Sequence, residues 1–395
     1  MDYDAERMFS ERTRFDLRAN RLARSLAERR ASGRPFIDLT QSNPTRAGLA
    51  GPADLLAPLA DEAALRYDPS PFGLAEARAA VAHDFAGRGY PLEPERIVLH
   101  ASTSEAYGFL FKLLCDPGDE VLVPRPGYPL FDFLAGLESV RVTSYALAWD
   151  GEWHLDVAAV AAALGPRTRA IVAVSPGNPT GAYLKRDELS GLEALCAERG
   201  LALVSDEVFA DYPLREDERR TASVARDATA LAFVLGGLSK SCGLPQLKLA
   251  WTAVVGPETL RREALARLEV VADTYLPVST PVQVAAPALL ARKHELQAPI
   301  RARVAGNLAA LRHALPADGP ATLLEPEGGW SAILRVPATS SEEERTLRLL
   351  DEKDVLVHPG YFFDFPGEAY LVLSLLPPPA EFAEGVARVL ADLVL

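Results

Sequence analysis

The sequence predicts an α/β protein in which a large domain, built on a mostly parallel sheet covered by helices, is joined to a smaller α+β domain. Short apolar runs alternate with helical patterns between the QSNPTRAG turn and about Pro257. Strands that are apolar on both faces and separated by helices are typical of parallel sheets buried between two helical layers. A chain of 395 residues is also longer than one hydrophobic core usually organises. These two observations predict the fold class and a division into two domains.

The predicted sheet consists of runs that have the length of strands and are rich in Val, Leu and Ile: Arg96–Leu99, Glu120–Val123, Ala170–Val174, Leu201–Ser205, Leu231–Leu235 and Leu249–Val255. Between two of these runs, Asp187–Arg199 has the pattern of a helix. Gly200 follows it directly, and glycine is the residue that most often ends a helix. The order strand, helix, strand is the unit from which parallel sheets are built.

The two ends of the chain are expected to form the smaller domain. An amphipathic helix is predicted from about Phe9 to Arg30, followed by a strand at Phe36–Leu39. After a long helical stretch, roughly residues 281–315, we expect strand Ser331–Val336, helix Glu342–Lys353, strands Val355–His358 and Ala369–Leu375, and helix Ala380–Leu393. The expected division gives residues 46–285 to the large domain and residues 1–45 and 286–395 to the small one.

Composition and charge exclude several classes of partner. The formal net charge is −13, and such a surface repels nucleic acids and anionic membranes. Cys115, Cys196 and Cys242 are the only cysteines, so neither a disulfide framework nor a metal site is expected. The first residues lack the apolar core of a signal peptide, and no apolar run reaches the length of a membrane span. We expect a cytoplasmic protein.

The strongest chemical signal is a lysine, Lys240, in the segment GGLSKSCGLP directly after a predicted strand. This position lies at the carboxyl edge of the sheet, where open α/β sheets bind ligands. Desolvation or a nearby positive charge lowers the pKa of a lysine and makes it a nucleophile toward an aldehyde. The alternative is an ordinary surface lysine on a loop. This segment alone leaves both interpretations open.

Polar residues follow other predicted strands at the same edge. Asp206 ends an apolar strand, where a buried carboxylate needs a cationic partner; a magnesium ligand or a helix cap are the alternatives. Ser102 and Glu105 have the spacing of a capping box, and a helix beginning there would offer hydroxyls and free amides to a phosphate, or simply be capped. Asn178, in the turn SPGNPTG, either faces this edge or belongs to a tight connection.

Taken together and in this order, the motifs SPGNPTG, SDE and GGLSKSCGLP resemble those of the class I/II aminotransferases. The segments YDPSPFG and DPGDEVLVPRPGYP add to the likeness, which runs from about Asp38 to Pro359. The resemblance implies the aspartate-aminotransferase-like fold type I, with a seven-stranded-type sheet. It also implies pyridoxal 5′-phosphate (PLP) as cofactor and a homodimer whose active sites are composite.

The resemblance also implies a role for individual residues. Lys240 would carry PLP as a Schiff base and shuttle the proton of the reaction, while Asp206 would hold the pyridine nitrogen. Asn178 would hydrogen-bond the phenolic oxygen of PLP, and Tyr128 would stack on its ring. The residues implied in binding its phosphate are Ser102, Thr103, Ser104, Ser239, Lys248 and, from the other subunit, Tyr67.

The sequence departs from the family's pattern at several positions. Phe209 stands where a tyrosine usually reaches the phenolic oxygen, Lys248 where an arginine usually binds the phosphate, and Gly237 where a hydroxyl residue is common. Val372 stands where an arginine normally clamps the substrate's α-carboxylate. Candidate substitutes that would bind the substrate, each equally explained by an ordinary structural role, are Asn43, Arg46 and Arg335.

The function implied is that of an aminotransferase, which moves an amino group between an amino acid and a 2-oxo acid through Lys240. A PLP-dependent lyase or cyclase acting on a modified amino acid would use the same residues. A PLP-binding regulator without catalysis is disfavoured, because only about 35 residues precede the fold and the surface is acidic. The motifs do not name the amino donor or the acceptor.

Overall fold

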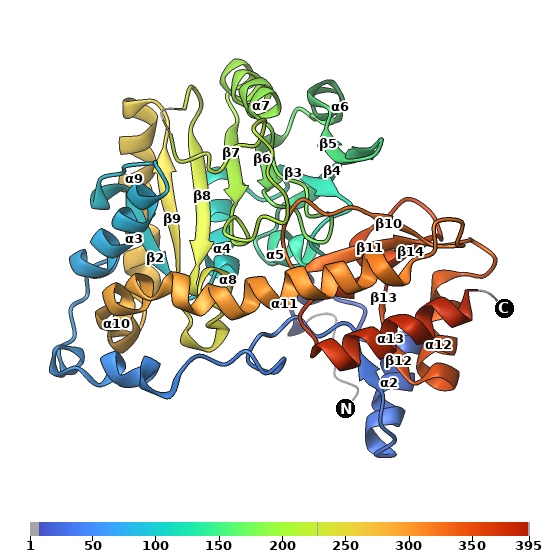
Figure 1. Ribbon diagram of the computed structural model, residues 1–395. Helices are drawn as coiled ribbons and strands as arrows, with labels where there is room; N and C mark the ends of the chain where they lie inside the picture. The colour runs from blue at the N-terminus through green and yellow to red at the C-terminus, as the bar shows by residue number, and fades with distance from the viewer. Residues whose placement is uncertain (1–7, 227, 394–395) are drawn as a thin grey trace.

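A mixed eight-stranded sheet forms the centre of the larger part of the molecule (Figure 1). The structure is a computed structural model that describes residues 8–226 and 228–393. The strands lie in the order β2 (Ile97–His100), β9 (Ala250–Val255), β8 (Ala232–Gly237), β7 (Ala202–Asp206), β6 (Thr168–Val174), β3 (Glu120–Arg125), β4 (Arg141–Trp149) and β5 (Trp153–Leu155). Neighbours from β8 to β4 are parallel, whereas β9 and β5 are antiparallel to the strands they pair with.

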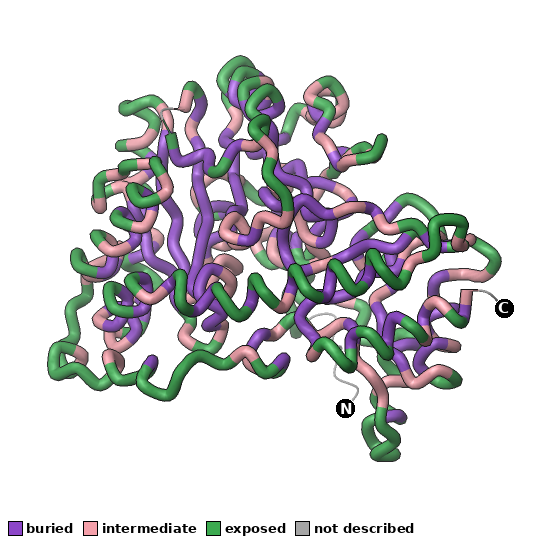
Figure 2. Tube along the Cα trace, in the orientation of Figure 1, coloured by how far each residue is buried: buried purple, intermediate pink, exposed green. Residues whose placement is uncertain are grey.

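Alternation along the strands explains why helices cover both faces of this sheet. In β8, for example, Phe233 and Leu235 belong to one apolar cluster and Ala232 and Val234 to the other. The first cluster is completed by α4 (Thr103–Leu114), α5 (Phe131–Leu137) and α9 (Glu258–Tyr275). The second is completed by α3 (Ala75–Gly87), α6 (Val157–Ala163), α7 (Arg186–Arg199) and α10 (Thr280–Ala291). Figure 2 shows the strands between them as buried.

A smaller four-stranded antiparallel sheet lies beside the large one (Figure 1). Its order is β10 (Thr322–Leu324), β11 (Ser331–Arg335), β14 (Tyr370–Ser374) and β13 (His358–Pro359). It packs with α11 (Lys293–Ala314) and α13 (Pro379–Asp392), and α11 runs from the large sheet to the small one. A short parallel pair, β1 (Ile37–Asp38) and β12 (Val355–Leu356), lies next to α2 (Arg21–Ala31) and α12 (Glu342–Lys353).

Short helices complete the described elements: η1 (Glu11–Thr13), η2 (Ala53–Ala60), η3 (Glu62–Leu65), η4 (Pro94–Arg96), α8 (Leu238–Ser241), η5 (Pro245–Leu247) and η6 (Gly360–Phe363). The expected N-terminal helix does pack with the small sheet's helices, since Leu22 of α2 contacts a cluster with Leu350 and Leu356. Gly200 ends α7 with a left-handed backbone (φ 66°), as predicted.

Several predicted elements were wrong in extent. The single helix from Phe9 to Arg30 is broken, because the Asn20 side chain accepts a hydrogen bond from Ala23 N–H and starts α2 at Arg21. The long helix predicted over residues 281–315 is interrupted at Arg292, which separates α10 from α11. The strand predicted at Val355–His358 is divided into β12, which pairs with β1, and β13, which pairs with β14.

The fold brings several strand ends to one edge of the large sheet. β2 and β8 are both antiparallel to β9, so β2 runs in the same direction as β8 and the parallel strands. The carboxyl ends of β2, β6, β7 and β8 therefore meet at the same edge. Each of these strands is followed by one of the polar segments identified in the sequence, and this edge faces the small sheet through Trp330 and Ser331.

Candidate active site

A cavity of about 380 Å³ lies at the carboxyl edge of the large sheet. Its walls come from all the motifs that follow β2, β3, β6, β7 and β8, and from the start of β11. The lining residues are Ser42, Ser102, Thr103, Ser104, Tyr128, Val174, Asn178, Asp206, Val208, Phe209, Gly237, Ser239, Lys240, Pro245, Ala250, Trp330 and Ser331. Segments that are far apart in the sequence thus meet around one space.

Lys240 lies on α8, the single helical turn that follows β8. Its Nζ is 5.4 Å from the centre of the Phe209 ring and 5.2 Å from that of Trp330, so aromatic side chains surround the amine. Burial lowers the pKa of Lys240, and the nearby Asp206 carboxylate opposes this shift only in part. A larger share of the side chain is therefore neutral amine near neutral pH than in a solvated lysine, as a nucleophile requires.

Asp206 ends β7 and is 7% exposed. Its Oδ2 accepts a hydrogen bond from the Tyr107 hydroxyl at 2.9 Å, and its Oδ1 accepts one from Val208 N–H at 3.2 Å. Burial raises the pKa of Asp206, although these hydrogen bonds and Lys240 favour the charged form. Because a cation in front of this carboxylate would favour its charge, the site suits a group that carries a protonated nitrogen.

The N-terminus of α4 provides an anion site. Ser102 caps the helix by accepting a hydrogen bond from Glu105 N–H at 3.1 Å, and the Glu105 carboxylate accepts one from Ala101 N–H at 2.7 Å. The helix therefore begins where the spacing predicted, but the Glu105 carboxylate accepts from Ala101 N–H and not from Ser102 N–H, so the reciprocal bond of a capping box is displaced by one residue. Thr103 and Ser104, the first residues of the helix, line the cavity, and the amide groups at a helix N-terminus suit a phosphate. Ser239, beside Lys240, lines the same cavity.

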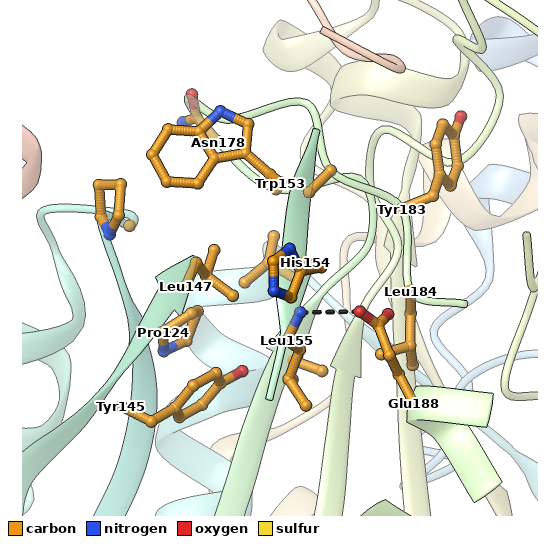
Figure 3. A pocket seen from close by; sticks show the side chains of 16 residues that line it. Pro124, Tyr145, Leu147, Trp153, His154, Leu155, Asn178, Tyr183, Leu184 and Glu188 are labelled. Atoms are coloured by element: carbon orange, nitrogen blue, oxygen red, sulfur yellow. Dashed lines mark hydrogen bonds between the residues drawn. The ribbon is translucent and has the colours of Figure 1, made fainter. Parts of the chain in front are cut away.

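Tyr128 and Asn178 complete the walls on the β3 and β6 side. Tyr128 is held edge-on against Phe131, with ring centres 5.6 Å apart. Asn178 also borders a second, much smaller cavity of about 30 Å³ (Figure 3), whose walls include Trp153 and Glu188. There Leu155 N–H donates to Glu188 at 2.7 Å and joins β5 to the start of α7. The turn that carries Asn178 therefore lies between the two cavities.

Five of the expected site residues are not part of the cavity's lining. Tyr67 is 65% exposed, and Lys248 is exposed with a left-handed backbone (φ 55°) after η5. Arg46 is exposed too, and Asn43 Oδ1 accepts hydrogen bonds from Thr45 N–H and Oγ1 at 3.0 and 2.8 Å. Their loop still reaches the cavity through Ser42.

Arg335 is the fifth, and the structure places it away from the cavity. It is exposed at the end of β11, whose first residue, Ser331, lines the cavity. Four residues of extended strand separate the two by roughly 13 Å. The expectation that Arg335 faces the cofactor is therefore not met.

The strand β14 shows the consequence of the valine that stands in place of the usual arginine. Val372 pairs with Ile333 and His358 and is 2% exposed, in an apolar cluster with Phe363 and Phe365. Two residues later, the Ser374 hydroxyl donates to Gln41 O at 2.6 Å. Among the residues that the structure describes, Lys240 is the only lysine or arginine lining the cavity.

Sequence reasoning missed four residues that shape this site: Tyr107, Ser42, Trp330 and Ser331. Tyr107 lies one helical turn after the Ser102 cap, so the capping box could have pointed to it as a side chain near the edge. Ser42 directly precedes Asn43, which the sequence suggested as a substrate-binding residue. Trp330 and Ser331 carry no motif, and only the folding of the small sheet brings them to the cavity.

Comparison with known proteins identifies the family. Residues 38–388 match the family described as aminotransferase class I and II, which is most of the chain. The chain is a class I/II aminotransferase. The predicted fold class is confirmed as well, because this aminotransferase shares its fold with a solved aminotransferase from Escherichia coli. That likeness has a TM-score of 0.86 at 22% identity and covers 98% of each chain.

The curated relatives of this aminotransferase include different activities. It is 26% identical over 385 residues to the alanine aminotransferase of Mycobacterium tuberculosis (strain ATCC 25618 / H37Rv), covering 91% of this chain and 85% of that protein. It is 30% identical over 222 residues to the S-alkyl-thiohydroximate lyase of Arabidopsis thaliana, covering 55% of this chain and 48% of that one. The first of these two likenesses extends over both sheets.

The donor set of this aminotransferase fits PLP. An anion site at a helix N-terminus, a buried carboxylate with hydrogen bonds to both oxygens, and an amine with a lowered pKa line one cavity. In the described part of the chain, no group of three or more His, Cys, Asp or Glu residues could hold a metal ion. No helix within residues 8–226 and 228–393 is long and apolar enough to cross a membrane.

Proposed function

We propose that this aminotransferase binds PLP in the cavity of about 380 Å³, with Lys240 as the residue that joins the cofactor and moves the proton of the reaction. The observation that carries the proposal is that Lys240, Asp206 and the capped N-terminus of α4 line one cavity. A lysine, a carboxylate and an anion site in this arrangement match the aldehyde, the pyridine nitrogen and the phosphate of one molecule.

PLP supplies an aldehyde that condenses with amines and a ring that accepts electrons. The residues of this chain orient it. Asp206 keeps the pyridine nitrogen protonated, and Tyr128 stacks on the ring. Asn178 donates to the phenolic oxygen, and Ser102, Thr103, Ser104 and Ser239 hold the phosphate, with Lys248 as a further charge. As a neutral amine, Lys240 would accept the proton that leaves the substrate's α-carbon. It would then donate this proton to complete the transfer of the amino group.

The amino acid and the 2-oxo acid that react here both carry a carboxylate. Val372 provides no cation for it, so we propose Arg46 as the group that compensates the charge, with Asn43 donating through its amide nitrogen. The loop of these residues reaches the cavity at Ser42. Arg335 is left out, because it lies at the exposed end of β11. The likeness to an alanine aminotransferase supports small amino acids as the first donors to test.

The proposal includes a cytoplasmic homodimer with composite active sites. Tyr67 supports it, because it is 65% exposed and lies two residues after Leu65, which ends η3 and is 87% exposed. Apolar side chains that protrude in this way are typical of surfaces that another chain covers. Within each chain we propose a large domain of residues 46–285 and a small domain formed by the remaining two segments.

A half-reaction tests the proposed activity. Holoenzyme mixed with an amino acid and no acceptor is expected to lose the absorbance of the PLP form and gain that of the pyridoxamine form. Addition of a 2-oxo acid should reverse the change. Consumption of the amino acid without any pyridoxamine form would contradict transamination.

A lyase is the second candidate, because the relative from Arabidopsis thaliana is a lyase. Lys240 and Asp206 would serve such a reaction equally well. It would release a leaving group from the substrate and regenerate the PLP form without an acceptor. The half-reaction therefore separates the two candidates in one experiment.

A further inference from the structure

A buried carboxylate, Glu327, lies in the loop that connects β10 to β11. It is 3% exposed and accepts two hydrogen bonds from Lys185 Nζ, at 2.8 and 2.6 Å. Tyr183 N–H donates to it at 3.1 Å, and Arg215 donates at 2.9 Å. Lys185 is 4% exposed, so this ion pair is enclosed by protein on both sides.

All the partners of Glu327 belong to the other side of the active site. Lys185 is the N-cap of α7, and Tyr183 follows the turn that carries Asn178. Arg215 also donates to Glu152 at 2.7 Å, so the network extends to the start of β5. The carboxylate thus ties the small sheet's loop to the Asn178 turn of the large sheet.

The same loop leads directly to Trp330. Leu214 N–H donates to Glu327 O at 2.8 Å, and Gly329 N–H donates to Tyr212 O at 3.0 Å, so the loop pairs with the backbone of residues 212–214. Gly328 packs closely against the same region, since a Cβ there would lie 2.5 Å from Tyr183 Cε2 and 2.9 Å from Tyr212 O. Three residues after Glu327, the Trp330 ring therefore enters the cavity from a loop fixed at several points.

Trp330 and Ser331 are the residues through which the small sheet and its loop line the cavity. The ring centre of Trp330 is 5.1 Å from that of Phe209 and 5.0 Å from that of Tyr212, both edge-on. Lys240 Nζ lies 5.2 Å from the same ring. A substrate held at the lysine would contact this indole. A shift of the indole would therefore change the space that the cavity leaves for the substrate.

We propose that Glu327, held by Lys185, is a positioning residue that fixes Trp330 as the wall contacted by the substrate. A buried ion pair contributes little net stability compared with apolar residues of the same size, but removal of one partner leaves an uncompensated charge. In this protein the ion pair acts on the position of the loop: the Glu327 carboxylate holds the loop in one position relative to the Asn178 turn. The inference rests on the proposed function only for the statement that substrate enters this cavity.

The variant Glu327→Gln tests the proposal, since it keeps the shape and removes the charge. In the holoenzyme we expect KM for the amino donor to rise at least tenfold while kcat stays within threefold, because Lys240 and Asp206 keep their contacts. Glu325→Gln is the matched control. It makes the same change two residues earlier in an exposed ion pair with Arg312, and its KM should stay within twofold of the wild type.

A second measurement needs no turnover. The chain has four tryptophans, so 5-fluorotryptophan labelling gives four fluorine signals, and Trp330→Phe assigns one of them. In Glu327→Gln the Trp330 signal should shift or broaden, whereas that of Trp251, inside the large sheet, should not. If Glu327→Gln does not fold, Arg215→Gln removes a half-exposed partner of the same carboxylate and should move the same signal and raise KM at least threefold.

An unchanged KM and an unchanged Trp330 signal in a folded variant would overturn the proposal, even if the protein were less stable. A fall in kcat with KM unchanged would overturn it too, because the effect would then lie at the reacting atoms. Absence of transamination in the wild type would instead count against the proposed function, and the fluorine signals would still decide the role of Glu327.

Discussion

Phe209 shows how one residue sets the electrostatics of the cofactor site. It lines the cavity, and Lys240 Nζ lies 5.4 Å from its ring centre. The ring itself has no hydrogen to donate to the phenolic oxygen of PLP. Asn178 is then the side-chain donor proposed for that oxygen.

Phe209→Tyr is predicted to lower the apparent pKa of the visible absorbance of the holoenzyme by about one unit, or about 1.4 kcal/mol. The added hydroxyl donates to the phenolic oxygen and stabilises its negative charge, so the chromophore loses its proton at lower pH. A spectral titration measures the shift. Phe209→Leu, which adds no donor, should show no decrease, and an unchanged or raised value in Phe209→Tyr would contradict the placement.

Gly237 and Ala250 face each other in the pairing of β8 with β9 and illustrate compensation between neighbours. A Cβ on Gly237 would lie 3.0 Å from Ala250 Cβ, so the methyl group of Ala250 occupies the space that a hydroxyl residue would need. Gly237→Ser is predicted to weaken PLP binding and lower the melting temperature. Adding Ala250→Gly should recover part of both losses, because the Cα of residue 250 and the carbonyl oxygen of Leu249, each 3.2 Å from the added Cβ, remain in place. Independent effects of the two changes would contradict this packing argument.

Some residues could be placed from the sequence and others could not, for a physical reason. Lys240, Asp206 and Asn178 each follow a buried strand, and the carboxyl ends of parallel strands meet at one edge. Local sequence patterns were therefore enough to predict that these three residues lie close together. Trp330 and Glu327 depend on contacts between the two sheets, which no local pattern contains.

At the scale of elements, burial decided which strands were recognised. The predicted strands are buried on both faces, as in β8, where every residue is buried. The missed strand β4 is at most half buried over most of its length, because it lies near the edge of the sheet and pairs with the β5 hairpin. Its sequence, RVTSYALAW, begins with four residues of which three are polar, and only its second half, Tyr145–Trp149, is an apolar run.

The N-terminus of α4 carries an element-scale prediction. Ser102→Ala removes the cap and one phosphate donor, so it should lower the free energy of unfolding by about 1 kcal/mol and weaken PLP binding by roughly tenfold or more. Ser341→Ala is the matched control, because Ser341 is also an N-cap serine, whose hydroxyl oxygen accepts a hydrogen bond from Glu344 N–H at the start of α12. It should lose similar stability and keep its PLP affinity, as measured by denaturation and by equilibrium binding of PLP. Equal loss of affinity in both variants would contradict a direct role of Ser102.

At the scale of the whole molecule, the exposed Tyr67 predicts a dimer in which each chain completes the site of the other. Sedimentation of the holoenzyme should show a dimer down to low concentration. Tyr67→Phe should weaken PLP binding about tenfold and leave the dimer intact, because only the hydroxyl contact is lost. Tyr275→Phe, which changes a tyrosine that is 53% exposed, is the control. A monomer with full specific activity would contradict the composite site.

The central claim is that Lys240 is the residue that carries the cofactor. Borohydride reduction of the holoenzyme followed by peptide mass spectrometry tests it most directly, because reduction makes the link between PLP and the amine permanent. We predict that the cofactor is found on the peptide that contains Lys240, that Lys248→Ala keeps this label, and that Lys240→Ala loses both the label and turnover. A label on another lysine, or turnover by Lys240→Ala, would contradict the account.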